Sequence, residues 1–173
     1  MRLNSRVAGG LTALLALAGL GTAYYAQLVL LLTPCDLCLW ERWPYRIVIV
    51  LGVLAALARP AGGRVILGLT GLVFLVGAGI AFLHVGVEFH WWNSPLPECN
   101  SMLTPGAPLP MVPDRPCDAP MYLVPGLPVS MSAMDFLFEA CMAVLLLVYV
   151  SRAERFSTEP KVSIKNHDLA RSK

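Results

Sequence analysis

The sequence is poor in charged residues. Asp, Glu, Lys and Arg make up 14% of its 173 residues, whereas soluble domains carry about 25%. The net charge is only +2, so the chain lacks the basic surface that nucleic-acid binding requires. Its hydrophobic content of 57% excludes intrinsic disorder. A chain with so little charge and so much apolar surface is expected in a membrane.

The apolar residues lie in four stretches, each near the roughly 20 residues that a helix needs to cross a bilayer. We expect an all-α fold, a four-helix transmembrane bundle that forms a single integral membrane domain over residues 1–173. The predicted spans are residues 7–32, 38–58, 65–89 and 134–150. A long proline-rich loop over about 91–132 separates the last two spans, and a tail follows over about 151–173.

Two details of these spans need interpretation. The first stretch, whose most polar side chain is Gln27, is too long for the apolar core of a signal peptide and has no convincing cleavage site. The second span begins either near Leu37–Leu39 or at Pro44, because a proline inside a helix removes a donor and introduces a kink. Glycines in the third span predict close helix packing; they are Gly68, Gly71, Gly77 and Gly79.

The basic residues predict the orientation. Of the 13 Lys and Arg residues, 10 fall at the two termini and in the short Arg59–Arg64 loop. Cytoplasmic segments carry such an excess, so we expect both termini in the cytoplasm. The segment Cys35–Cys38 and the proline-rich loop then face the outer side of the membrane.

Four of the five cysteines fall on the predicted outer side of the membrane, and the fifth falls within a predicted span. Disulfides persist on the outer side of the membrane, and the four cysteines there are enough for two pairs. We interpret Cys141, alone in the fourth span, as a small buried core residue. The outer four are Cys35, Cys38, Cys99 and Cys117.

Cys35 and Cys38 form a C-x-x-C unit, a spacing that serves both zinc sites and thiol redox centres. Zinc needs further ligands, typically a second close pair, so we expect no metal. A disulfide between such close residues constrains little chain entropy, which favours a redox role. A helix N-terminus and a nearby cation both favour the reactive thiolate. Arg42, one turn after Cys38, either provides that cation or snorkels to the membrane surface.

The segment over residues 93–128 carries 10 of the 14 prolines and predicts an extended, irregular tether for Cys99 and Cys117. A plain structural disulfide would stabilise such a loop. The loop is either a handle for a soluble protein partner or a simple connector.

Except for the tail after Arg152, the chain resembles one family: DsbB, the disulfide bond formation protein of the bacterial inner membrane. The proline-rich loop with Cys99 and Cys117 contributes to this resemblance. Met121 and Tyr122 depart from it, because other members often carry a tryptophan there. The resemblance rests above all on the segment directly after the first span, Pro34-Cys35-Asp36-Leu37-Cys38-Leu39-Trp40-Glu41-Arg42.

The resemblance implies a multi-pass inner-membrane enzyme, a thiol:quinone oxidoreductase with periplasmic cysteines. Electrons would pass from a reduced DsbA-like thiol oxidase to Cys99 and Cys117, then to Cys35 and Cys38. The last acceptor would be a membrane quinone, either ubiquinone or menaquinone. Arg42 would stabilise negative charge near that quinone. His84 would either contact the quinone or pair with Glu88, one turn away.

Three alternatives compete with this interpretation. An enzyme similar to vitamin K epoxide reductase would carry its quinone-facing C-x-x-C late in the chain, whereas here it comes first. A DsbB-like paralogue dedicated to one secreted partner fits the same residues. A non-enzymatic scaffold stapled by a disulfide explains the spans, but not a C-x-x-C followed by an intramembrane arginine.

Overall fold

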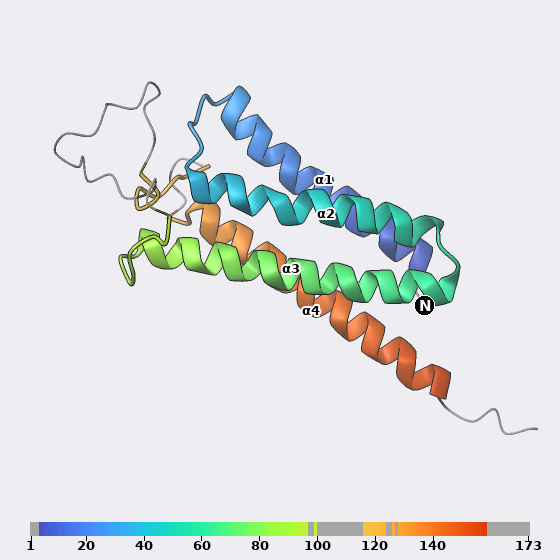
Figure 1. The fold of residues 1–173 in the computed structure, drawn as a ribbon. Coiled ribbons are helices and arrows are strands. Elements are labelled where there is room, and N and C mark those ends of the chain that lie inside the picture. Colours follow the sequence, from blue (N-terminus) through green and yellow to red (C-terminus); the bar gives the residue numbers. More distant parts are fainter. Residues whose placement is uncertain (1–3, 97–98, 100–115, 124–125, 127, 159–173) are drawn as a thin grey trace, which may run out of the picture.

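The computed structural model describes residues 4–96, 99, 116–123, 126 and 128–158, with side chains up to 152. This part of the chain contains no strand, and its helices lie side by side as an elongated bundle (Figure 1). They are α1 (Ser5–Leu28), α2 (Asp36–Leu57), α3 (Pro60–Glu88) and α4 (Met131–Thr158). The all-helical prediction is confirmed. Most of the proline-rich loop and the end of the tail lie outside the described residues.

Three helices are long and apolar enough to cross a membrane: α1, α3 and the part of α4 over Met131–Arg152. Helix α2 contains Glu41, Arg42 and Arg46 within its 22 residues. These charges make it less apolar than its neighbours, so the second of the four predicted spans is not confirmed by apolar length.

The chain leaves α1 earlier than residue 32, where the first predicted span ends. The helix ends at Leu28, and Leu31 then adopts a left-handed conformation with φ of 55°. Further along, Pro34 disfavours helical geometry at Thr33, the residue before it, so the helix does not resume there. The chain therefore turns and runs extended into Cys35.

Helix α2 begins at Asp36, two residues before the predicted start, and the alternative start at Pro44 is wrong. Pro44 lies within the helix, where it removes a single backbone donor. Cys35 is the N-cap, and its Sγ atom accepts a hydrogen bond from the backbone N–H of Cys38 over 3.3 Å. This bond satisfies one of the free donors of the first turn.

Neighbouring helices approach closely where small residues meet. A Cβ atom added to Gly52 of α2 would lie 3.0 Å from the Gly9 carbonyl oxygen of α1. The predicted packing of the third span is confirmed at Gly71, which lies against Leu146 and Leu147 of α4. It fails at Gly79, which faces open space. Small residues therefore set the spacing of the bundle at particular crossings.

Cys141 is a free cysteine on the exposed surface of α4. The prediction that it is buried in the core is wrong. It lies beside Met142 and Ala143, which turn inward and are buried, so the helical rotation directs Cys141 outward.

Candidate redox site

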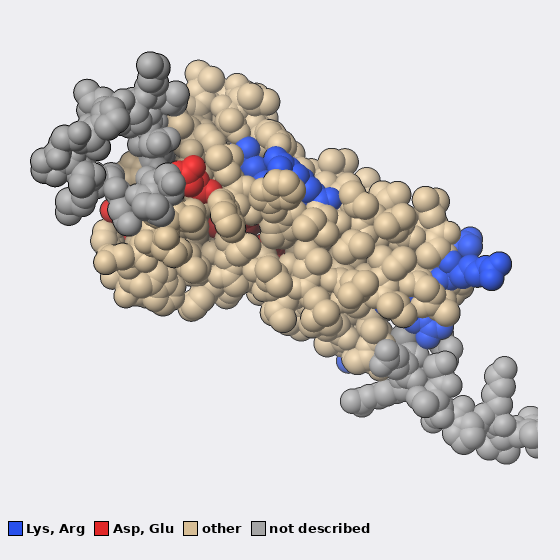
Figure 2. Space-filling model, in the orientation of Figure 1, with Lys and Arg blue, Asp and Glu red and all other residues tan. Residues whose placement is uncertain are grey.

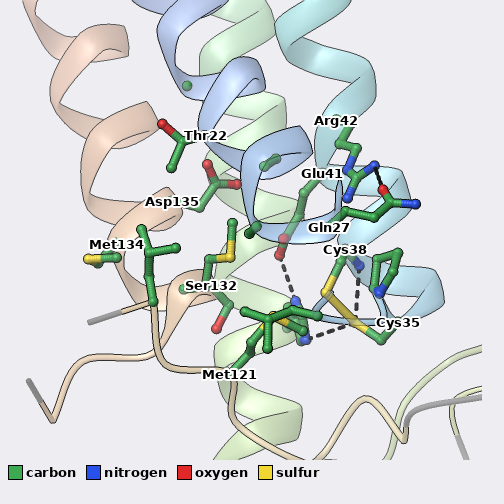
Figure 3. A pocket seen from close by; sticks show the side chains of 18 of the residues that line it. Thr22, Gln27, Cys35, Cys38, Glu41, Arg42, Met121, Ser132, Met134 and Asp135 are labelled. Atoms are coloured by element: carbon green, nitrogen blue, oxygen red, sulfur yellow. Dashed lines mark hydrogen bonds and ion pairs between the residues drawn. A yellow bond between two sulfur atoms is a disulfide. The ribbon is translucent and has the colours of Figure 1, made fainter. Parts of the chain in front are cut away.

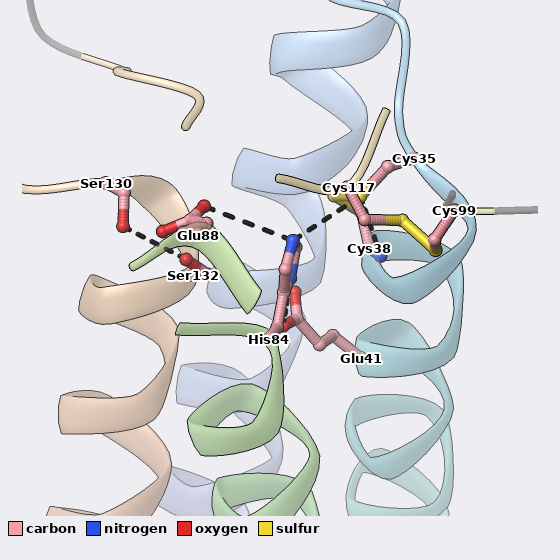
Figure 4. Close-up of a disulfide and its surroundings, with 9 residues drawn as sticks. All are labelled: Cys35, Cys38, Glu41, His84, Glu88, Cys99, Cys117, Ser130 and Ser132. Atoms are coloured by element: carbon pink, nitrogen blue, oxygen red, sulfur yellow. Dashed lines mark hydrogen bonds and ion pairs between the residues drawn. A yellow bond between two sulfur atoms is a disulfide. The ribbon is translucent and has the colours of Figure 1, made fainter. Parts of the chain in front are cut away.

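Four of the cysteines form two disulfides that lie together at one end of the bundle (Figure 4). One joins Cys35 to Cys38 and is called the inner pair below. The other joins Cys99 to Cys117 and is called the outer pair. Their Cα–Cα separations are 5.1 and 5.0 Å. Cys35, Cys99 and Cys117 belong to a single buried cluster, against which Cys38 packs. The fold thus brings two redox-capable pairs, far apart in the sequence, into one contact.

The two sulfur atoms of the inner pair have different surroundings. Cys35 is 5% exposed and lies in the buried cluster with the outer pair. Cys38, one turn into α2, is half-buried. Both cysteines line a cavity between the helices, the same cavity that Arg42 lines.

His84 connects α3 to the inner disulfide. Its Nε2 atom lies 3.6 Å from the Sγ atom of Cys35, and its Nδ1 atom lies 2.7 Å from Oε1 of Glu41. Glu88, the partner considered from the sequence, is farther away, at 4.0 Å from Nε2. When Nδ1 donates to Glu41, Nε2 presents a lone pair to the sulfur. His84 is therefore placed to take a proton from a thiol at Cys35.

Arg42 is directed into the bundle rather than outward. It is 7% exposed, and its NH1 atom donates to Oε1 of Gln27 over 2.6 Å. Its guanidinium lies 4.9 Å from the centre of the Tyr24 ring. Arg46, one turn later, is exposed and donates to the Tyr24 hydroxyl over 2.9 Å. The snorkelling interpretation therefore suits Arg46 and not Arg42.

The cavity between the helices has a volume of about 190 Å³ and a mainly apolar lining (Figure 3). An apolar cavity of about 150 Å³ is enough to hold benzene, so this one suits a substituted six-membered ring. Polar groups enter it from several helices. They are Thr22 and Gln27 of α1, Glu41, Arg42 and Tyr45 of α2, His84 and Glu88 of α3, and Ser132 and Asp135 of α4.

A family model described as Disulfide bond formation protein DsbB matches residues 5–149. The chain belongs to the DsbB family. This match includes helices α1 to α3 and most of α4, and confirms the resemblance seen in the sequence. Together with the three membrane-length helices, DsbB membership indicates an inner-membrane protein.

Several curated relatives are named Disulfide bond formation protein B. One from Xanthomonas campestris pv. campestris is 44% identical over 78 residues, 43% of this chain and 45% of the relative. One from Herminiimonas arsenicoxydans is 31% identical over 87 residues, 50% of this chain and 55% of the relative. One from Acinetobacter baumannii is 30% identical over 103 residues, 58% and 60% of the two chains. The matches span about half the length of these DsbB relatives, and no solved structure matches significantly.

Sequence reasoning missed six polar residues of this DsbB-family site: Thr22, Gln27, Glu41, Tyr45, Ser132 and Asp135. Ionisable residues within membrane spans are functional candidates by default. That rule singled out Arg42 and applies equally to Glu41 and Asp135. Nothing local distinguishes Tyr45, because its partner Asp135 lies on a different helix.

Cys35, Cys38 and His84 also have the spacing of a metal site, with ligand atoms within 4.8 Å of one another. The sequence offered no third ligand near the C-x-x-C unit, and α3 supplies one. However, metal binding by cysteine requires thiolates. Both sulfur atoms are committed to a disulfide, so the oxidised site offers no thiolate to a metal ion.

Proposed function

We propose that the protein is a membrane thiol:quinone oxidoreductase that reoxidises a periplasmic DsbA-like disulfide donor. The contact between the two disulfides, beside a cavity that Arg42 lines, is the observation that carries this proposal. A structural disulfide needs no second disulfide against it, whereas thiol–disulfide exchange requires two sulfur pairs within reach.

The proposed arrangement in the inner membrane places both termini in the cytoplasm and both disulfides at the periplasmic surface. Figure 2 shows basic side chains at the end of the bundle that holds the N-terminus, a further basic group partway along the bundle, and acidic side chains toward the opposite end. That distribution agrees with the positive-inside rule. Helix α2 would also cross the membrane, as the second of four spans, because Glu41 and Arg42 are buried inside the bundle and away from lipid.

The outer pair would receive two electrons and two protons from the partner's dithiol, which becomes a disulfide. A thiolate of the reduced outer pair would then attack the inner disulfide and form a mixed disulfide. Cys35 is the expected point of attack, because it lies in the same buried cluster as Cys99 and Cys117. Cys38 would leave as the thiolate, and the outer disulfide would form again.

The cavity fits a quinone ring in size and in its polar groups. A quinone held there would supply an acceptor for two electrons and two protons. Arg42 would hold one ligand oxygen and stabilise the thiolate of Cys38, one turn away. The pair of His84 and Glu41 would take the proton of Cys35 as the inner disulfide forms again.

The test is quinone reduction by the purified full-length protein in detergent, with a reduced DsbA-type oxidase and a short-chain ubiquinone analogue. We expect absorbance changes that report stoichiometric quinone reduction and partner oxidation. Cys38→Ser should abolish both under multiple turnover, whereas Cys141→Ala serves as the matched cysteine control. No reduction by the intact protein, or full activity of Cys38→Ser, would overturn the proposal.

A further inference from the structure

Asp135 of α4 has one carboxylate oxygen that is satisfied and one that is not. Its Oδ1 atom accepts a hydrogen bond from the hydroxyl of Tyr45. Its Oδ2 atom is buried and has no hydrogen-bond partner among the described residues. Asp135 lines the cavity from α4, whereas Arg42 and the inner disulfide line it from the side of α2 (Figure 3). Asp135, whose buried Oδ2 atom lacks a partner in the described part of the chain, therefore lines the same cavity as the reactive cysteines.

The surroundings of Asp135 favour a carboxyl group that carries its proton. A buried carboxylate without a cation is costly, especially within a membrane span. The cation that lines the same cavity, Arg42, is engaged by Gln27 and the Tyr24 ring. Because Tyr45 donates to Oδ1, a proton on Asp135 belongs on Oδ2, where no protein acceptor competes for it. A neutral carboxylic acid in such a site is a donor.

We propose that Asp135 is a catalytic residue that donates a proton to the quinone oxygen not held by Arg42. This role rests on the proposed function and adds a proton donor to it, distinct from the pair of His84 and Glu41, which takes the proton of Cys35. Tyr45 would act as a positioning residue, because its hydrogen bond to Oδ1 fixes the orientation of the Asp135 carboxyl group and leaves Oδ2 to carry the proton.

Protons and electrons balance in this scheme. Formation of the Cys35–Cys38 disulfide releases two electrons, and the two protons that entered with the partner's dithiol would complete the reduction of the quinone. Asp135 breaks its O–H bond as the electrons arrive and is left as a carboxylate. One of the two protons then restores Asp135, and the other reaches the oxygen beside Arg42. Both cysteines and Asp135 line the same cavity, so the transfer stays within it.

Glu139 provides a matched control on the same helix. It is one turn deeper, fully buried, and both its oxygens lack a partner among the described residues. Unlike Asp135, it does not line the cavity. Asp135→Asn preserves the size of the side chain and an oxygen that accepts from Tyr45, but it removes the transferable proton. Glu139→Gln makes the same chemical change outside the site.

The first measurement compares these two variants in the quinone-reduction assay. We expect Asp135→Asn to slow quinone reduction about 10²-fold. It should leave the quinone-free exchange between the DsbA-type partner and the cysteines unchanged. Glu139→Gln should retain near wild-type turnover. If Asp135→Asn is fully active, or if Glu139→Gln is equally slow, the inference is wrong. If the wild-type protein itself reduces no quinone, the proposed function fails instead.

The second measurement does not depend on turnover. Infrared spectra of the quinone-free protein should contain a carbonyl band of a protonated carboxylic acid that disappears in Asp135→Asn. The same band should remain in Glu139→Gln. If Asp135→Asn removes no such band, Asp135 is ionised and has no proton to donate, which overturns the inference.

Discussion

The Nε2 atom of His84 lies 3.6 Å from the Sγ atom of Cys35, although 49 residues separate them in the sequence. This contact joins the third helix to the cap of the second at the inner disulfide. It also places Glu41 behind the imidazole, 2.7 Å from Nδ1, where its carboxylate orients the ring.

His84→Ala should slow quinone reduction by about 10²-fold or more, because the thiol proton of Cys35 loses its acceptor. The measurement is steady-state turnover with a reduced DsbA-type partner. His90→Ala is the matched control, because the His90 side chain is 74% exposed and pairs with Asp118 at the surface. That control should stay within about twofold of wild type. Equal losses in both variants would contradict a specific role for His84.

Arg42→Met should raise the KM for the quinone analogue about tenfold or more. A hydrogen bond to a charged group contributes about 1.5–3 kcal/mol, and methionine keeps much of the apolar stem. The check is turnover measured against quinone concentration. Arg46→Met changes the exposed arginine one turn later and should leave the KM nearly unchanged. An unaltered KM in Arg42→Met would argue against contact between Arg42 and the quinone.

Gly77→Ala should destabilise the protein by about 1–3 kcal/mol, a typical cost of overpacking. A Cβ atom at Gly77 would collide with the carboxyl group of Glu139 on α4. Gly79→Ala, on the same helix, would place its Cβ atom in open space and should cost no stability. Thermal unfolding in one detergent compares the two variants. Equal midpoints would show that α3 and α4 separate readily at this crossing.

Cys141 should react as the single free thiol of the oxidised protein. The other four of its five cysteines are in disulfides, and Cys141 is exposed on α4. A small membrane-permeant maleimide should label one site per chain without reductant, and Cys141→Ala should remove the label. Because the residue lies outside the redox cluster, turnover should change by less than about twofold. More than one labelled site would contradict the two disulfides.

Much of the fold follows from short-range properties of the sequence. Apolar length predicts membrane helices because a bilayer imposes the same requirement on every span. Pro34 and the C-x-x-C unit mark the boundary between α1 and α2, since proline acts on the residues beside it. The exact ends were less predictable. The end of α1 at Leu28 and the continuation of α2 through Pro44 depend on neighbouring turns and packed helices.

The cysteine motif and Arg42 could be recognised from residue type and spacing, because residues one turn apart on a helix share a face. The partners of these residues could not. Contacts such as His84 with Cys35 and Tyr45 with Asp135 join different helices, and no local pattern encodes how helices rotate against one another. The same rotation turned Cys141 outward. The residue types and their spacing indicated thiol redox chemistry. The cavity in which these side chains meet forms only when the helices pack.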